Sequence, residues 1–243
     1  FYDKTICADD ILQKGKKSLE IKPIAHIRTD FGEKFGIPRQ SGLCSLLEGK
    51  IVFEPEFAKR ESVRGLEEFS HIWLIWQFSE NPPTSSLTVR PPRLGGNKRV
   101  GVFASRSPFR PNSLGLSCVR LKSIEYSSSG EPVINVFGAD LCDKTPIFDI
   151  KPYVVYADSH PGARSGFVDD RKWQKLDVEI SEDVDRHLRL QGLNAEKIEI
   201  LKEVLAQDPR PHYQKDPHKV YGMPYEGLDI HFTVCDHTLT VVK

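Results

Sequence analysis

The stretch His71–Phe78 (HIWLIWQF) decides the fold class of this 243-residue chain. Its aromatic and β-branched residues favour a β-strand. Further stretches of the same kind lie on both sides of it, separated by turns rich in proline and glycine: Lys22–Thr29, Lys50–Glu54, Arg99–Ala104, Leu116–Tyr126 and Pro132–Ala139. The connections are too short for the helical crossovers of a parallel sheet. The sequence therefore predicts a mainly β fold, either an antiparallel barrel or a sandwich.

Helix signals replace strand signals after about residue 160. Ser181, followed by two acidic residues, and Asn194 are each predicted to begin a helix, and the second helix must end near Asp208 because prolines follow. Alternating residues over 228–234 and 238–242 predict a β-hairpin. We therefore expect an N-terminal extension (1–21), a β domain (22–165) and a C-terminal α+β appendage (166–243).

The charge of the chain is balanced overall but unevenly distributed. Thirty-four basic residues face 34 acidic ones, so the net charge does not identify a nucleic-acid-binding protein. Between Glu80 and Glu125, however, acidic residues are absent while basic residues are frequent. This basic segment is a candidate contact for phosphates.

Composition also narrows the cellular setting. The five cysteines are scattered without a CxxC pair, which is typical of reduced thiols in a cytoplasmic protein. The longest apolar run, Ile72–Trp76, is too short to span a bilayer, so we expect no membrane association. The nearest approach to a metal-ligand set is His231, Cys235 and His237, but strand neighbours alternate between faces, so we expect no metal.

Three stretches hold more polar and turn-forming residues than folding requires. Lys34–Gln40 (KFGIPRQ) is a turn stiffened by proline, Val89–Gly115 combines glycines, prolines and arginines, and Asp140–Tyr153 (DLCDKTPIFDIKPY) follows a predicted strand. Guanidinium and backbone N–H groups suit an anion, whereas carboxylates at a strand end suit ribose hydroxyls or a ligand cation. Each stretch taken alone is equally compatible with an ordinary surface loop.

Several well-known catalytic patterns are missing from the sequence. It contains no GxGxxG, GxxxxGK[ST], GxSxG or HExxH. A Rossmann site, a P-loop, a hydrolase nucleophile elbow and a zincin centre are therefore excluded. The sequence singles out no catalytic residue.

Taken together and in this order, several motifs closely resemble the TrmO (YaeB/TsaA-like) family of S-adenosylmethionine-dependent tRNA adenine-N6 methyltransferases. The motifs are PRQ (38–40), GLEEFSHIW (65–73), RPPRLGG (90–96), GVFASRSPFRPNSLGLS (101–117), DLCDKTPIFDIKPY (140–153) and QDPRPHY (207–213). The resemblance covers the chain from about Pro23 onward. It implies a small antiparallel β-barrel with a C-terminal appendage, and S-adenosylmethionine as cofactor. It also implies a cofactor site completed at a homodimer interface, and the threonylcarbamoylated adenosine of a threonine tRNA as substrate.

Carried over by position, the resemblance places cofactor contacts on eleven residues: Pro38, Arg39, Gln40, Ser79, Glu80, Arg106, Leu116, Asp140, Leu141, Cys142 and Asp143. Arg39 or Arg106 would hold the cofactor carboxylate, while Asp140 and Asp143 would face one cleft and hold the ribose or balance the sulfonium. The sequence departs from the family pattern at Ser79, where a histidine is usual, and at Lys144, where a glycine is usual.

We expect tRNA to be bound by basic and aromatic side chains of the basic segment and of the appendage: Arg90, Arg93, Lys98, Arg99, Arg110, Arg210 and Tyr213. The appendage is expected to serve tRNA rather than cofactor. The alternative is a non-catalytic barrel that binds RNA or a nucleotide through the same loops. Carboxylates beside a basic groove distinguish the two, because RNA binding alone does not need them.

Overall fold

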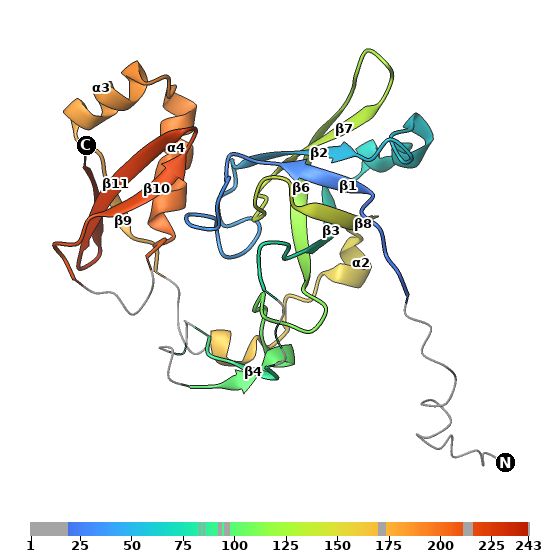
Figure 1. Ribbon diagram of the computed structural model, residues 1–243, viewed down its shortest axis with the longest axis horizontal. Helices are drawn as coiled ribbons and strands as arrows, with labels where there is room; N and C mark the ends of the chain where they lie inside the picture. Colours follow the sequence, from blue (N-terminus) through green and yellow to red (C-terminus); the bar gives the residue numbers. More distant parts are fainter. Residues whose placement is uncertain are drawn as a thin grey trace.

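The computed structural model describes residues 19–82, 84, 86–91, 94, 98–169, 174–210 and 216–242. In Figure 1 the chain forms a β-barrel, in blue to yellow, beside a smaller α+β domain in orange and red. Among the described residues, no helix is both long and apolar enough to cross a membrane.

Six antiparallel strands close the barrel in the order β1-β2-β7-β6-β3-β8. Their bounds are β1 (Ala25–Arg28), β2 (Glu48–Phe53), β3 (His71–Gln77), β6 (Leu114–Tyr126), β7 (Pro132–Phe137) and β8 (Pro146–Pro152). This barrel confirms the predicted fold class. The strand β8 was not predicted, because prolines at both ends made its sequence resemble a loop.

Alternation along β3 directs its apolar side chains into the barrel. Ile72, Leu74 and Trp76 are buried, whereas their neighbours on the strand are half-exposed. The long strand β6 pairs with β3 along its first half and with β7 along its second, and the register shifts between Leu121 and Ser123. Such an irregularity bends a strand, which allows one strand to serve two sides of a closed barrel.

A glycine on β6 makes room for the largest side chain of the barrel interior. Gly115 pairs with Trp76, and a Cβ atom at position 115 would lie 2.3 Å from Cε2 of the indole. No side chain fits at that distance, so the Trp76 ring can lie flat over the strand only because residue 115 is glycine.

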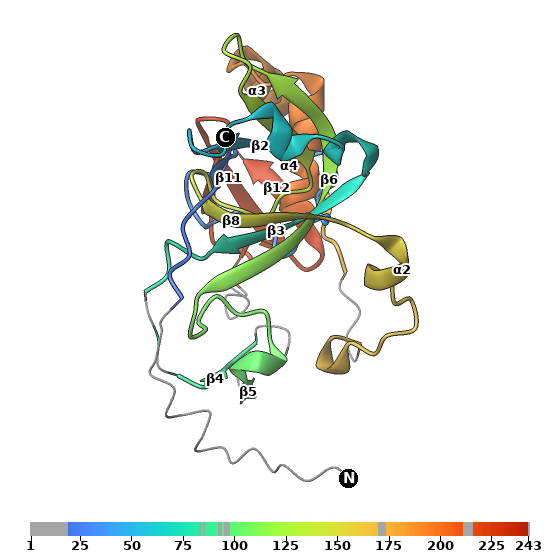
Figure 2. The same ribbon diagram turned by 90° about the vertical axis from the view of Figure 1, so that its right-hand side faces the viewer.

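The part of the basic segment that precedes β6 forms a small subdomain below the barrel (Figure 2). It contains β4 (Thr88–Val89), β5 (Val100–Gly101) and the 3-10 helix η4 (Val102–Ala104). The strand predicted over Arg99–Ala104 is therefore wrong in its second half, where the chain turns after Gly101. The remaining short elements are η1 (Arg60–Val63), η2 (Leu66–Glu68), α2 (Val155–Asp158) and η5 (Gly166–Val168).

The C-terminal domain packs two helices on a four-stranded sheet of order β10-β11-β12-β9. Its elements are β9 (Asp177–Glu179), α3 (Glu182–Leu190), α4 (Ala195–Ala206), β10 (Tyr221–Tyr225), β11 (Leu228–Cys235) and β12 (Thr238–Val242). Both predicted helix starts are confirmed, because Ser181 Oγ accepts from the Val184 N–H and Asn194 Oδ1 from the Lys197 N–H. The predicted hairpin is β11–β12, while β9 and β10 were not predicted.

Residues 31–47, which make up most of the connection between β1 and β2, join the barrel to the C-terminal domain. We call this segment the pocket loop. Phe31, Cys44 and Leu47 are buried in the same apolar cluster as the α4 residue Leu201 and the β10 residue Met223. The core of the C-terminal domain is thus completed by side chains that belong to the barrel half of the chain.

Candidate active site

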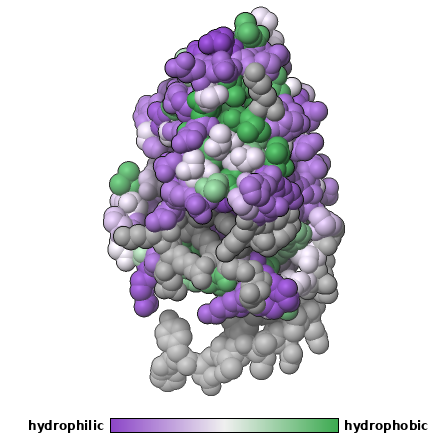
Figure 3. All heavy atoms as spheres, turned by 90° about the vertical axis from the view of Figure 1, so that its left-hand side faces the viewer, coloured by the Kyte–Doolittle hydropathy of each residue, from purple (hydrophilic) through white to green (hydrophobic). Residues whose placement is uncertain are grey.

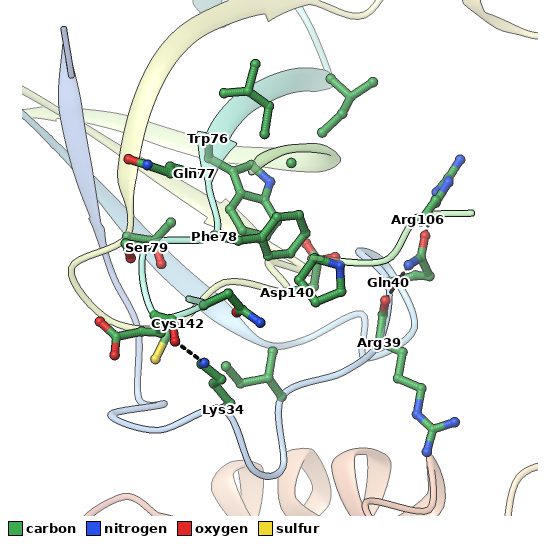
Figure 4. Close-up of a pocket in the computed structure, with 18 of the residues that line it drawn as sticks. Lys34, Arg39, Gln40, Trp76, Gln77, Phe78, Ser79, Arg106, Asp140 and Cys142 are labelled. Atoms are coloured by element: carbon green, nitrogen blue, oxygen red, sulfur yellow. Dashed lines mark hydrogen bonds between the residues drawn. The ribbon is translucent and has the colours of Figure 1, made fainter. Parts of the chain in front are cut away.

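A pocket of about 450 Å³ opens where β3 ends. Its walls come from the pocket loop, the end of β3, the turn at 105–110, the start of β6 and the segment at 140–145. Figure 4 shows these segments converging around Phe78 and Asp140. The volume is in the usual range for a site that encloses a small organic ligand.

The deep end of the pocket is built on a chain of hydrogen bonds. The Trp76 Nε1–H donates to Ser117 Oγ over 3.0 Å, and the Ser117 hydroxyl donates to Asp140 Oδ1 over 2.6 Å. Ser117 is 1% exposed. Phe78 packs edge-on against Trp76, with ring centroids 4.3 Å apart. An aromatic wall therefore stands beside a carboxylate that is oriented by Ser117, which Trp76 holds in turn.

Burial raises the pKa of the Asp140 carboxyl above its usual range. The Ser117 hydroxyl, backbone N–H groups and the positive charge of Arg106 oppose this shift by stabilising the carboxylate. The pocket therefore contains a carboxylate that is costly to ionise alone. A cation placed beside it would offset that cost.

The open side of the pocket is basic. Arg106 donates through Nη1 to Gln40 Oε1, so two of the predicted cofactor contacts, from segments far apart in sequence, touch one another (Figure 4). Lys34 donates through Nζ to the Glu80 carbonyl and ties the pocket loop to the end of β3. Two carboxylates, Glu80 and Asp140, are among the described residues that line the pocket.

The structure brings together nine of the eleven residues predicted to contact cofactor, and all nine line this pocket: Pro38, Arg39, Gln40, Ser79, Glu80, Arg106, Leu116, Asp140 and Cys142. Leu141 is buried in the barrel core instead. Asp143 also lies outside the lining, since its carboxylate accepts from the Thr29 N–H and pairs with Arg28. The expectation that Asp140 and Asp143 face one cleft is therefore wrong. Asp143 anchors the end of β1.

The residues predicted to bind tRNA fall into three groups. Arg90, Lys98 and Arg99 are exposed on the basic segment. Arg110 lines the pocket and donates to the Ser105 and Ser107 carbonyls, and Arg210 forms an ion pair with Asp208 beside the C-terminal domain. Both are thus engaged within the protein. Arg93 and Tyr213 lie outside the described residues.

Sequence reasoning missed several residues that shape the pocket. Trp76 and Ser117 were taken only as strand residues, and Lys34 only as part of a turn. The available signal was their position next to predicted site residues, because Ser117 follows Leu116 by one and Trp76 precedes Ser79 by three. Among the described residues, no group of three or more His, Cys, Asp or Glu side chains is placed to hold a metal ion.

The comparisons with known proteins identify the family of the chain. The family model of the tRNA-methyltransferase O N-terminal domain matches residues 26–159, and that of the TrmO C-terminal domain matches residues 173–243. The chain belongs to the TrmO family.

Named relatives cover almost the whole chain. A Pseudomonas aeruginosa protein with the provisional name of an S-adenosylmethionine-dependent methyltransferase is 44% identical over 87% of this chain and 91% of its own length. The Escherichia coli tRNA (adenine(37)-N6)-methyltransferase is 37% identical over 90% of this chain and 94% of its own. A crystal structure of TrmO from Pseudomonas aeruginosa superposes with a TM-score of 0.72 at 35% identity, covering 92% of this chain and 96% of that one.

One departure from the TrmO pattern has a visible structural consequence. Lys144, at a position where the family usually has glycine, adopts a left-handed backbone with φ of 64°. Glycine enters this region without steric cost, whereas a lysine is strained there. The turn into β8 therefore has a conformation that suits glycine better than the lysine that occupies it.

The raised pKa of Asp140 predicts how stability depends on pH. The folded state holds the Asp140 proton more tightly than the unfolded chain does, so the free energy of unfolding should fall as pH rises from the ordinary carboxyl value through the raised one. Asp140→Asn cannot titrate and should lack this decrease. Urea unfolding at about pH 4 and about pH 8 should show the variant gaining stability relative to the wild type at the higher pH.

Ser117→Ala is the matched variant for this measurement. It removes a hydrogen bond that favours the carboxylate, so the decrease of stability with pH should become steeper. It should also cost about 1–3 kcal/mol at any pH, because the Trp76 N–H loses its buried partner. A pH dependence that is identical in wild type and Asp140→Asn would contradict the assignment.

Proposed function

We propose that this protein is an S-adenosylmethionine-dependent tRNA methyltransferase that methylates N6 of an adenine. The observation that carries the proposal is the partly buried Asp140 carboxylate, which accepts from Ser117 in a pocket with a basic rim. RNA binding by itself does not need such a carboxylate, whereas a site for a sulfonium or a ribose can use one. The Escherichia coli relative named for this activity is similar in sequence over 94% of its length, and the TrmO crystal structure shares the fold over 96% of its chain.

The residues present fit the chemical groups of the cofactor. When bound, S-adenosylmethionine supplies a methyl group on a positively charged sulfur. Arg106 at the rim suits its carboxylate, Asp140 suits a positive charge or a ribose hydroxyl, and the Trp76–Phe78 wall suits flat apolar groups. Asp143 is not assigned to the cofactor, because its carboxylate binds Arg28 and the Thr29 N–H at the end of β1.

The contribution of the protein is mainly positioning and exclusion of water. Methyl transfer is an in-line displacement, so holding two reactants in line supplies much of the rate enhancement. Ser117 and Trp76 hold Asp140 still, and the aromatic wall keeps the deep end of the pocket dry. A base of an anticodon loop is unpaired, so little unstacking energy is needed for it to reach the pocket.

We further propose the finer identity that the family resemblance implies. The substrate nucleoside is threonylcarbamoylated adenosine beside the anticodon, and the tRNA accepts threonine. We infer a cytoplasmic setting, where such tRNAs are present and thiols stay reduced. The four cysteines that the structure describes are unpaired thiols, which supports this setting.

We also propose a homodimer whose interface covers the mouth of the pocket. Apolar side chains of the subdomain and the pocket rim are exposed: Leu87 at 68%, Phe103 at 77%, Phe109 at 45% and Leu116 at 58%. The Leu87 carbonyl accepts from the Val102 N–H, which places Leu87 next to the turn that carries Phe103. A patch of this kind is usually buried against a partner.

Isothermal titration with S-adenosylmethionine tests the cofactor assignment. Wild-type protein should bind it, and Arg106→Ala should weaken binding by about 2 kcal/mol, roughly 30-fold, because a charge-assisted contact is lost. Arg120→Ala is the matched control, since Arg120 is exposed on β6 and packs over Phe137 outside the pocket. Unchanged affinity in Arg106→Ala would remove Arg106 from the site. No binding by folded wild type would favour the non-catalytic alternative.

Binding of tRNA should weaken steeply with salt, whereas cofactor binding should not. Each phosphate contact adds about 0.7 to the slope of log affinity against log salt, so Lys98→Ala with Arg99→Ala should lower that slope by roughly 1.4. Lys59→Ala with Arg60→Ala is the matched control, because this adjacent exposed pair lies outside the basic segment. If both double variants show the same salt slope, Lys98 and Arg99 make no phosphate contacts, and the basic segment is excluded as the surface that binds RNA.

Sedimentation velocity tests the homodimer. We expect a dimer for the wild type and a monomer for Phe103→Glu, because a charge on the exposed apolar patch would oppose its burial. Leu190→Glu, at a side chain that is 80% exposed on α3, should remain dimeric. A wild-type monomer that still methylates tRNA would rule out a dimeric site.

A further inference from the structure

The pocket loop belongs to two structural units at once. Its residues Ile37 to Gln40 line the pocket, while Phe31, Cys44 and Leu47 are buried in the core of the C-terminal domain. Gly36, with φ of 90°, lies so close to Met223 that a Cβ at position 36 would be 2.3 Å from its sulfur. The wall of the pocket therefore rests directly on the C-terminal domain.

The turn after α4 makes the polar contacts to this loop. Gln207 is buried, and its side-chain amide donates to the Leu43 carbonyl over 3.5 Å. The Asp208 carbonyl accepts from Nη2 of Arg39 over 3.3 Å. In Figure 4 the Arg39 side chain leaves the pocket and extends toward the helix below it. Arg39 thus contributes to the pocket wall while its guanidinium is held by the C-terminal domain.

An ion pair holds that carbonyl in place. Asp208 has a left-handed backbone with φ of 52°, which a non-glycine residue adopts at a cost. Arg210 binds both of its carboxylate oxygens, with Nε to Oδ1 at 2.8 Å and Nη2 to Oδ2 at 3.0 Å. The two side chains are only 14% and 16% exposed. A two-point pair in such a site locks the turn and the direction of the Asp208 carbonyl.

We propose that Asp208 and Arg210 are positioning residues for the cofactor pocket, an inference that rests on the proposed function of that pocket. They fix the turn that holds Arg39, and through Arg39 they fix the wall formed by Pro38, Arg39 and Gln40. Gln40 in turn accepts from Arg106, so the arrangement extends to the basic rim. Cofactor affinity then depends on the C-terminal domain.

This role differs from the direct tRNA contact expected of Arg210 from sequence. Its guanidinium already donates to Asp208 through two nitrogens and is largely buried. The open side of the nearby sheet is poorly suited to phosphates as well, since Asp177, Glu179 and Asp229 are exposed on its strands and His231 pairs with Asp229. The face in Figure 3 carries hydrophilic side chains on both sides of a central band of hydrophobic ones.

The test combines cofactor affinity with the motion of the loop. In full-length Arg210→Ala, we expect S-adenosylmethionine to bind about tenfold or more weakly in isothermal titration, because a displaced wall misplaces its contacts. Amide hydrogen exchange over residues 37–45 should accelerate. Turnover at saturating cofactor should stay within about twofold of wild type, so KM for cofactor rises while kcat is kept.

The matched control is the pair Asp183–Arg186 on α3, which is exposed and distant from the pocket loop in sequence. Arg186→Ala should change neither cofactor affinity nor exchange of the loop. Arg210→Lys keeps the positive charge but loses the two-point contact of the guanidinium. It should therefore retain only part of the wild-type cofactor affinity. Asp208→Asn tolerates the left-handed backbone and should reproduce the Arg210→Ala phenotype even if that variant folds poorly.

Two results would overturn the proposal. Unchanged cofactor affinity and unchanged loop exchange in both Arg210→Ala and Asp208→Asn would show that the ion pair positions nothing. If Arg210→Ala binds tRNA more weakly and with a lower salt slope while its cofactor affinity is unaltered, Arg210 contacts RNA instead. Failure of the proposed function is recognised separately, as a folded wild type that binds no S-adenosylmethionine, and loop exchange still decides whether the pair holds the loop.

Discussion

The hydrogen bond from the Trp76 indole to Ser117 is the interaction on which both the barrel end and the pocket depend. Trp76 is the last inward side chain of β3, and it can lie over β6 only because Gly115 has no Cβ. Its N–H must find a partner once buried, and Ser117 Oγ accepts from it while the Ser117 hydroxyl donates a hydrogen bond to Asp140. The packing of Trp76 in the core and the orientation of the Asp140 carboxylate thus depend on the same serine hydroxyl.

The pocket loop extends this arrangement to the second domain. A connection without regular secondary structure is normally the mobile part of a β-barrel. Here its apolar side chains are buried in the C-terminal core, and the Ser45 N–H donates to the Glu203 carboxylate of α4 over 3.0 Å. The loop is therefore ordered by the neighbouring domain rather than by its own strands. That explains how a site built largely from turns can hold a defined shape.

Local patterns were sufficient for much of the architecture. Enrichment in β-branched and aromatic residues located β3 and β6, the Ser181 and Asn194 caps located both helices, and the paired alternating stretches located the β11–β12 hairpin. Local sequence patterns failed where strand propensity is opposed by proline or overridden by tertiary contacts. Prolines at both ends concealed β8, and the chain direction after Gly101 depends on contacts with Leu87 rather than on the propensity of Arg99–Ala104.

The sequence by itself determined the fold class and, through motifs shared with a family, which segments meet at the pocket. Only the tertiary structure decided which side chains in those segments face it. Asp140 and Asp143 are three residues apart and chemically alike, yet one lies beside Ser117 in the pocket while the other holds β1. The same holds for Arg210, whose direction is set by a buried carboxylate two residues away. Spacing along the chain cannot supply this information, because the direction of a side chain in a turn depends on the partners that the rest of the fold brings to it.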